Sequence, residues 1–140
     1  VLVIATDAMQ FVTHRLSHVM RSRSHSEHHK RTHPTVSDAF HTGWADALCQ
    51  LMIPVLLSIW IIKPARESAT AYGIFYGLWL QWIHSDNTRA LACRSRVFVT
   101  PAHHRLHHIH PHKNFGHVLR MWDILCGTDA TPSAAIKTKT

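Results

Sequence analysis

The chain has 140 residues, enough for one domain or part of one, which excludes a multidomain machine. Apolar residues make up 46% and charged residues only 16%, below the roughly 25% typical of soluble domains. Intrinsic disorder is therefore disfavoured, and some apolar segments are expected to avoid water. The 15 histidines equal the lysines and arginines together in number, and the net charge of +7 brings nucleic acid or a lipid surface into consideration as an anionic partner.

The first third of the chain divides into an apolar start, a basic histidine-rich segment and a loop. Val1 to Ala5 is predicted to be the last turns of an apolar helix that begins before residue 1, and Asp7 marks a polar boundary. Phe11 to His33 contains neither Gly nor Pro, so helix is permitted throughout. Pro34 to Gly43 carries turn and capping residues and is predicted to be a loop.

Two apolar stretches follow, Leu48 to Ile62 and Ala71 to Ile83, joined by the polar, turn-forming segment Lys63 to Ser68. Both are long for strands, so helix is the better prediction. Each is shorter than the roughly 20 residues of a full membrane span. They are expected to form an apolar helical hairpin that enters a membrane, and the alternative is a pair of core helices in a soluble helical domain with a basic surface.

The distribution of positive charge favours the membrane interpretation. Only Lys63 and Arg66 would lie at the tip of the hairpin. Ten basic residues lie on the opposite side: Arg15, Arg21, Arg23, Lys30, Arg31, Arg89, Arg94, Arg96, Arg105 and Lys113. The positive-inside rule then predicts that the histidine-rich side faces the cytoplasm.

The histidines form three clusters with helical spacing. The first is HxxxH, the second HxxHH and the third again HxxHH: His14 and His18; His25, His28 and His29; His104, His107 and His108. Residues three or four apart share one face of a helix, so each cluster directs two or three imidazoles at one volume. Without metal, so many converging rings would leave buried nitrogens unpartnered or positive charges repelling one another. Two divalent ions, each bound by four or five nitrogens, remove both problems.

A buffering tract, a zinc hydrolase and a nucleic-acid-binding protein fit these residues less well. A polyhistidine buffering tract would lack fixed spacing. A zinc hydrolase would need a base such as the Glu of HExxH, and Glu27 stands at the wrong spacing. Nucleic-acid binding is not expected, because the basic residues are interleaved with ligand-type histidines and match no nucleic-acid motif.

The order of motifs resembles the fatty acid hydroxylase (sterol desaturase) superfamily of integral-membrane di-iron enzymes. The resemblance runs through HxxxH, HxxHH, the apolar hairpin, the His-Ser-x-Asn phrase at His84 and the Thr-Pro-x-x-His-Arg-x-His-His phrase that starts at Thr100. It closes with Asn114-Phe115-Gly116 and with the segment from Trp122 to Thr128.

The resemblance implies nine metal ligands: His14, His18, His25, His28, His29, His84, His104, His107 and His108. His84 is included only through the His-Ser-x-Asn match, because its spacing alone would indicate a capping or surface histidine. Asp7 and Asp123 could accept N–H bonds from ligand imidazoles or cap helices. His103 points about 100° from its neighbour on a helix and is expected beside the ligands or exposed. Solvated loop positions are expected for the remaining histidines, which are His33, His41, His110, His112 and His117. One of the last three could instead line the substrate entry or bind a lipid headgroup.

The implied fold is an all-α membrane protein, with an apolar helical hairpin and a cytosolic helical cap that holds a histidine-rich dimetal site. Residues 1–130 are expected to form the hydroxylase-like domain, lacking the family's N-terminal transmembrane part, and residues 131–140 a disordered tail. The implied cofactors are two Fe ions, with Zn as an alternative occupant, and O₂ is the co-substrate.

The implied activity is hydroxylation or desaturation of a C–H bond in a lipid such as a fatty acid or sterol. Electrons would come from an external donor of the cytochrome b5, ferredoxin or reductase type. The bacterial inner membrane or the endoplasmic reticulum is the implied location, with the histidines on the cytoplasmic face. The alternative function is a non-catalytic, histidine-rich zinc-binding membrane protein or an inactive fragment.

Overall fold

A computed structural model describes residues 1–132, and over this range the chain is helical, as predicted, with one isolated antiparallel bridge between Phe98 and Leu119. Most of the predicted disordered tail, residues 133–140, lies outside the described residues. The helices are α1 (Leu2–Val19), α2 (Arg23–His28), η1 (Val36–Phe40), α3 (Trp44–Asp46), η2 (Ala47–Met52), α4 (Ile53–Ile62), α5 (Arg66–Ile83), α6 (Thr88–Ala92), α7 (Pro101–Ile109) and α8 (Met121–Leu125).

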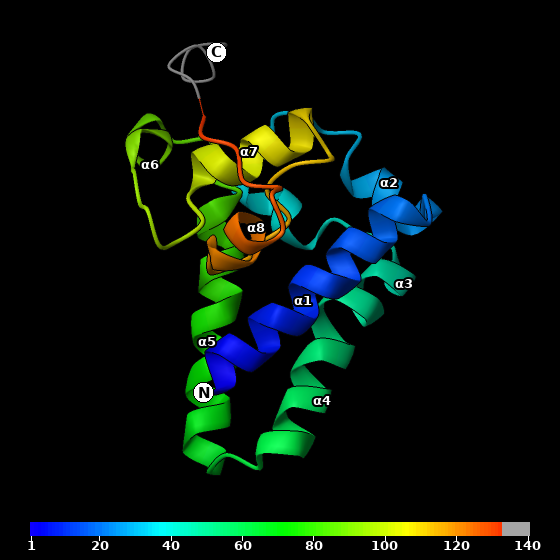
Figure 1. The fold of residues 1–140 in the computed structure, drawn as a ribbon, viewed down its shortest axis with the longest axis vertical. Coiled ribbons are helices and arrows are strands. Elements are labelled where there is room, and N and C mark those ends of the chain that lie inside the picture. Colours follow the sequence, from blue (N-terminus) through cyan, green and yellow to red (C-terminus); the bar gives the residue numbers. More distant parts are fainter. Residues whose placement is uncertain (133–140) are drawn as a thin grey trace.

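The predicted apolar hairpin is present, and its two arms meet in a short turn far from the rest of the chain (Figure 1). The first arm ends at Lys63, which adopts a left-handed conformation with φ 51°, and Pro64 follows it. A left-handed residue followed by Pro is a common helix stop, because Pro cannot continue the helix. The second arm, α5, then returns to the end of the molecule that holds the histidines.

The first arm is longer than the apolar stretch predicted, because α3, η2 and α4 join into one helix, Trp44–Ile62. Its 19 residues span about 28 Å at 1.5 Å per residue, close to the thickness of a bilayer core. Among the described residues it is the one helix that is long and apolar enough to cross a membrane. Only 22% of the tested stretch is buried within the protein, whereas a core helix of a soluble protein would be mostly buried.

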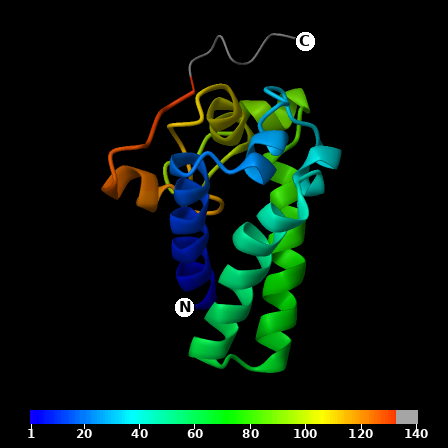
Figure 2. The ribbon, with the colours of Figure 1, turned by 90° about the vertical axis from the view of Figure 1, so that its right-hand side faces the viewer.

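Helix α1 lies against this arm, and a buried amide in the π-helical segment η2 joins the two (Figure 2). The Nε2 group of Gln50 donates to the carbonyl of Thr13 at 3.1 Å and to the hydroxyl of Ser17 at 2.6 Å, while the Thr13 hydroxyl donates to Gln50 Oε1. The prediction that an apolar helix ends before Asp7 was wrong. The helix continues to Val19, because the C-terminal segment buries Asp7 and satisfies its oxygens.

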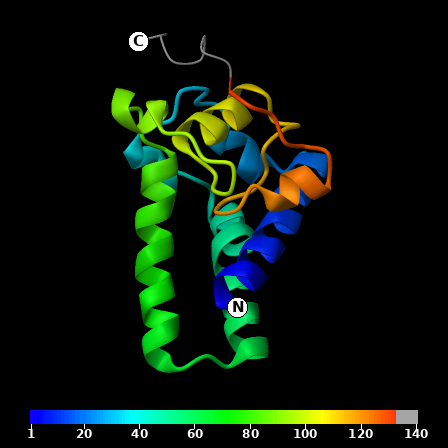
Figure 3. The same ribbon diagram turned by 60° about the vertical axis from the view of Figure 1, so that its left-hand side comes forward.

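The short helices gather over the open end of the hairpin and form a cap (Figure 3). Apolar side chains of α5 and of the segments that form the β-bridge fill the core beneath it, among them Tyr76, Leu80, Val99 and Val118. The helix permitted from Phe11 to His33 is interrupted at Arg21, whose φ of 51° turns the chain, and Ser22 then caps α2. This break brings the first two histidine clusters face to face.

Candidate metal centre

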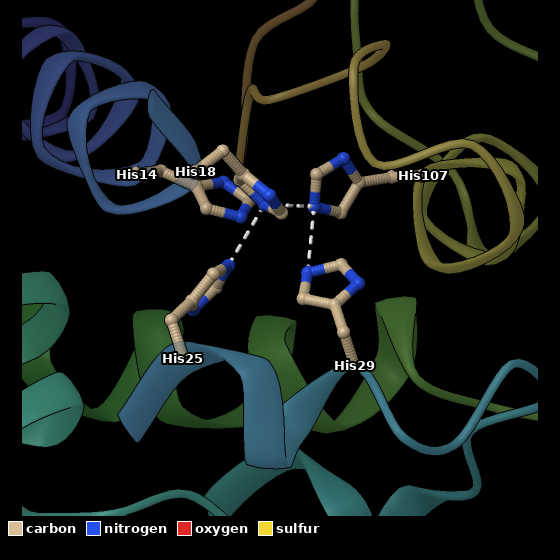
Figure 4. A group of neighbouring side chains, drawn as sticks. All are labelled: His14, His18, His25, His29 and His107. Atoms are coloured by element: carbon tan, nitrogen blue, oxygen red, sulfur yellow. Dashed lines mark hydrogen bonds between the residues drawn. The ribbon is translucent and has the colours of Figure 1, made fainter. Parts of the chain in front are cut away.

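Five histidines from three helical segments converge in a first group, which we call the five-histidine group (Figure 4). It comprises His14, His18, His25, His29 and His107. His14 and His18 lie one turn apart on α1, and His25 and His29 lie one turn apart at α2, so each pair presents its rings from one side of a helix. The candidate ligand nitrogens of all five rings lie within 4.8 Å of one another.

Four histidines form a second group, which we call the four-histidine group: His28, His84, His104 and His108. His104 and His108 lie one turn apart on α7, and His28 ends α2. His84 follows the last residue of α5, where its Nδ1–H donates to the Leu80 carbonyl at 2.7 Å and its ring turns inward. The two groups therefore contain the nine histidines that the resemblance implied, and each belongs to one group only.

Backbone and carboxylate oxygens determine which ring nitrogen carries the proton. The Nδ1–H of His14 donates to the Phe115 carbonyl at 2.7 Å, and that of His25 donates to the Asp46 carboxylate at 3.0 Å. The Nδ1–H of His107 donates to the Lys113 carbonyl at 2.6 Å. A neutral imidazole has one N–H, so these rings present an unprotonated Nε2 to the group. Such partners orient metal-binding imidazoles and raise their basicity.

The distances between the Nε2 atoms fit rings that share an ion. In the five-histidine group, His18 Nε2 lies 2.9 Å from that of His25 and 3.1 Å from that of His107. In the four-histidine group, His104 Nε2 lies 3.0 Å from that of His84 and 3.1 Å from that of His108. Two nitrogens bound at about 2.1 Å to one ion, at angles between about 90° and 110°, lie roughly 3.0–3.4 Å apart.

Burial favours the neutral form of five of these imidazoles. It lowers the pKa of His14, His104, His107 and His108 well below 6.5, and neighbouring histidines lower it further. The same two causes lower the pKa of His84 to about 4. Neutral imidazole is the form that binds a metal ion, so the rings are ready for coordination at neutral pH. The Nδ1 atoms of His29, His104 and His108 are buried without a hydrogen-bond partner within the described structure.

A carboxylate that no sequence motif singled out, Asp46, contacts the five-histidine group directly. Both of its oxygens lie within 3.1 Å of His25 Nδ1, its Oδ2 also accepts from Thr42, and its backbone N–H donates to Ser24. The contact crosses 21 residues, from α3 to α2, and no local spacing predicts it. The only signal in the sequence is an isolated acidic residue at the start of an apolar helix.

Asp7 and Asp123 have partners other than the predicted imidazoles. Asp7 accepts from the backbone N–H groups of Val118 and Leu119 and from the indole of Trp122. Asp123 accepts from the N–H groups of Phe115 and Gly116 and from the hydroxyl of Thr128. Both carboxylates therefore hold the segment 115–119 in place, and their influence on His14 passes through the Phe115 carbonyl.

Gly116 is required in this segment for steric reasons. A Cβ atom at Gly116 would lie 2.6 Å from the Leu119 carbonyl oxygen and 3.0 Å from Asp123 Oδ2. The close approach lets the carboxylate of Asp123 reach two consecutive backbone N–H groups.

Two further histidines near the groups are buried. His103 was expected either beside the ligands or exposed, and it is buried next to the ligand His104 in the sequence. Its Nδ1 pairs with the hydroxyl of Thr100 at 2.8 Å. His117 was expected in a solvated loop and this prediction was wrong, because only 6% of its surface is exposed. Its Nδ1 lies 2.7 Å from the hydroxyl of Tyr76, and its ring centre lies 5.0 Å from that of His14.

A small cavity of about 40 Å³ lies between the two groups. It is lined by His14 and His25 of the first group, by His28, His84 and His104 of the second, and by Asp46, Gln50, His117, Leu51 and Leu80 among others. One water needs about 10–15 Å³ measured in the same way, so the cavity holds a diatomic molecule or a few waters. Any small molecule inside it has access to both groups.

The fold and the site thus define a helical protein with two histidine groups, each of which could hold a metal ion. The sequence profile of the fatty acid hydroxylase family matches residues 1–128, and the chain belongs to this family. No solved structure matches the chain significantly.

Two curated proteins are similar to the chain over most of its length. An alternative squalene epoxidase of Phaeodactylum tricornutum is 30% identical over 138 residues, which cover 94% of this chain and 40% of the relative. An alkylglycerol monooxygenase of Danio rerio is 28% identical over 137 residues, which cover 93% of this chain and 30% of the relative. The chain therefore spans less than half the length of either.

Proposed function

We propose that the protein is a membrane-bound di-iron oxygenase that inserts oxygen into, or desaturates, a C–H bond of a lipid. The single observation that carries the proposal is the pair of histidine groups facing one small cavity. The five-histidine group would hold one iron and the four-histidine group the other. When bound, the two irons supply the activation of O₂ that an unactivated C–H bond requires.

The residues of the chain prepare the site for this chemistry. Asp46 and the carbonyls of Leu80, Lys113 and Phe115 accept hydrogen bonds from the Nδ1–H groups of four ligands, which leaves the Nε2 atoms of these rings free to bind a metal ion. Burial favours the neutral form of the buried rings His14, His84, His104, His107 and His108, because a charged imidazole would lose its solvation there. Within the described residues both groups consist of histidines, and imidazole suits iron as well as zinc.

The membrane supplies the substrate in this proposal. Helix Trp44–Ile62 would lie in the bilayer with its exposed apolar residues towards lipid, and the cap would lie at the surface with the basic residues. The names of the two relatives, squalene epoxidase and alkylglycerol monooxygenase, both describe oxygen transfer to a lipid, so we expect a lipid with a long hydrocarbon part. We infer a cytoplasmic orientation of the cap and an external electron donor.

The experiment is turnover of a lipid panel by the full chain in vesicles, loaded with Fe(II) and supplied with a reductant and ¹⁸O₂. The proposal predicts either ¹⁸O in the product or an alkene, dependent on iron. The His104→Ala variant should lose turnover, while the His103→Ala control, which changes a neighbouring buried histidine outside both groups, should retain iron. A chain that binds zinc tightly and gives no product with iron would favour the non-catalytic alternative.

A further inference from the structure

A buried pair of Tyr76 and His117 lies at the edge of the metal centre and has no part in the proposed function. The Tyr76 hydroxyl lies 2.7 Å from Nδ1 of His117, and the exposed fractions of the two residues are 5% and 6%. His117 is a member of neither histidine group, yet it lines the cavity between them. Its ring centre lies 5.0 Å from that of the ligand His14, so the pair joins the metal centre to the interior side of α5.

The hydroxyl of Tyr76 is the feature of this pair that packing does not require. Phenylalanine would fill the same space in the core, and a buried hydroxyl costs free energy unless it is hydrogen-bonded. A phenol that is hydrogen-bonded to an imidazole gives up an electron more readily than an isolated one, because its proton can move to the imidazole as the electron leaves. The pair is therefore suited to one-electron oxidation.

Two tryptophans continue from Tyr76 along α5. Tyr76, Trp79 and Trp82 stand three residues apart, a spacing at which helical side chains are neighbours. The indole N–H of Trp79 donates to the His117 carbonyl at 2.8 Å, and the rings of Trp79 and Trp82 lie 4.7 Å apart between their centres. Trp82 is partly exposed, in the last turn of α5. These aromatic side chains lead from the cavity to the surface over about 9 Å of helix.

We propose that His117, Tyr76, Trp79 and Trp82 form a redox path that protects the metal centre when it has been oxidised by O₂ and no lipid C–H bond is in reach. The inference rests on the proposed function, because an oxygen-activating centre supplies the oxidant. The centre takes an electron from Tyr76, and the missing electron is replaced from Trp79 and then from Trp82. A small water-soluble reductant, such as a thiol or an enediol, restores Trp82 at the surface.

Electrons and protons balance at each step of this path. One electron leaves Tyr76 and reduces the centre by one unit, while the hydroxyl proton moves along the hydrogen bond to Nδ1 of His117. The neutral tyrosyl radical then accepts an electron from Trp79 and recovers its proton from His117. Trp79 takes an electron from Trp82, and the soluble reductant reduces the radical cation of Trp82. The net change is the transfer of one electron from the reductant to the metal centre.

The first test of the path does not require iron. The full chain in phosphatidylcholine vesicles, loaded with redox-inert Zn(II), is oxidised by flash photolysis of a ruthenium tris-bipyridine complex with a quencher in the aqueous phase. Electron paramagnetic resonance should detect a neutral tyrosyl radical, because oxidation of Trp82 draws an electron from Tyr76. The Tyr76→Phe and Trp82→Phe variants should each lose at least ten-fold of this signal.

Two matched controls should leave the tyrosyl signal unchanged. The chain has two tyrosines, and Tyr72→Phe removes the other one, which is as buried as Tyr76 but whose hydroxyl has no hydrogen-bond partner within the described part of the chain. Trp60→Phe removes an indole that is 72% exposed on α4, away from the path. All four variants should bind as much Zn(II) as the parent chain, which shows that they fold. A purely structural role of Tyr76 would lower the melting temperature of Tyr76→Phe and leave the radical signal in place.

The second test uses the Fe(II)-loaded chain exposed to O₂ without lipid. Peptide mass spectrometry should find added oxygen on Trp82 in the parent chain. In Tyr76→Phe the added oxygen should appear on the ligand histidines instead, because the oxidised centre has lost its electron source. Equal oxidation of Trp82 in the parent chain and in Tyr76→Phe would overturn the protective role.

The two tests separate this inference from the proposed function. No tyrosyl signal in the Zn(II)-loaded parent chain, or an equal signal in Tyr76→Phe, would overturn the path and leave the proposed function standing. A tyrosyl signal that depends on Tyr76 and Trp82, in a chain that gives no iron-dependent product from any lipid, would overturn the proposed function and leave the path as a route for electrons.

Discussion

Replacement of Asp46 by Asn tests whether the second carboxylate oxygen and its charge strengthen metal binding by the five-histidine group. The asparagine Oδ1 can still accept from His25 Nδ1, and its Nδ2 can donate to Thr42, so the local hydrogen bonds and the shape persist. The substitution removes the negative charge of the Asp46 carboxylate, whose two oxygens both lie within 3.1 Å of His25 Nδ1. Loss of such a partner typically weakens metal binding by about 10–100-fold, or roughly 1.4–2.7 kcal/mol.

The assay is competition for Fe(II) or Zn(II) between the full chain and a chromophoric chelator. We expect one of two binding steps to weaken by about ten-fold or more in Asp46→Asn and the other to stay unchanged. Asp129→Asn is the matched control, because Asp129 binds Arg120 and no histidine of either group. The reasoning is refuted if both steps weaken equally, or if neither changes.

Three more predictions concern ligand identity, pH and the C-terminal segment. Elemental analysis should find one metal ion fewer in His104→Ala and an unchanged content in His103→Ala; equal losses would contradict the assignment to groups. The metal-free chain should lose stability below pH 6.5, because His84, with a pKa of about 4, is neutral when folded and protonated when unfolded. Protonation of His84 alone lowers the free energy of unfolding by about 1.4 kcal/mol for each pH unit between 6.5 and 4. A melting temperature that does not change between pH 7.5 and 5.5 would contradict this prediction. Asn114→Ala should lower the free energy of unfolding by about 2–4 kcal/mol in chemical denaturation. The variant loses two hydrogen bonds to Ala130 and places alanine at φ 57°. A loss below about 0.5 kcal/mol would show that this link is dispensable.

The local part of the site could be predicted from the sequence because helical spacing is a local property. His14 and His18, or His104 and His108, share a face whatever the rest of the chain does. His84 could not be found this way, since its position depends on where α5 ends relative to α7. Only the resemblance to a family pointed to it.

Contacts between distant segments were the part that could not be predicted. The partner of Asp46 lies 21 residues away, and the partners of Asp7 lie more than 110 residues away. An imidazole partner or a helix-capping role was expected for Asp123, which instead holds the backbone whose carbonyl at Phe115 orients His14. His117 follows a polar, histidine-rich stretch and was expected in a solvated loop, yet it is buried and pairs with Tyr76 of α5. In each case tertiary packing determined the partner, and local sequence carried no information about it.

The central claim is that the nine histidines hold two metal ions, and the most direct measurement is the stoichiometry and coordination of iron in the full chain. Anaerobic titration with Fe(II), followed by X-ray absorption at the iron edge, should show two tight equivalents per chain with nitrogen ligands at about 2.0–2.2 Å. One equivalent or none, or a first shell dominated by oxygen, would contradict the claim.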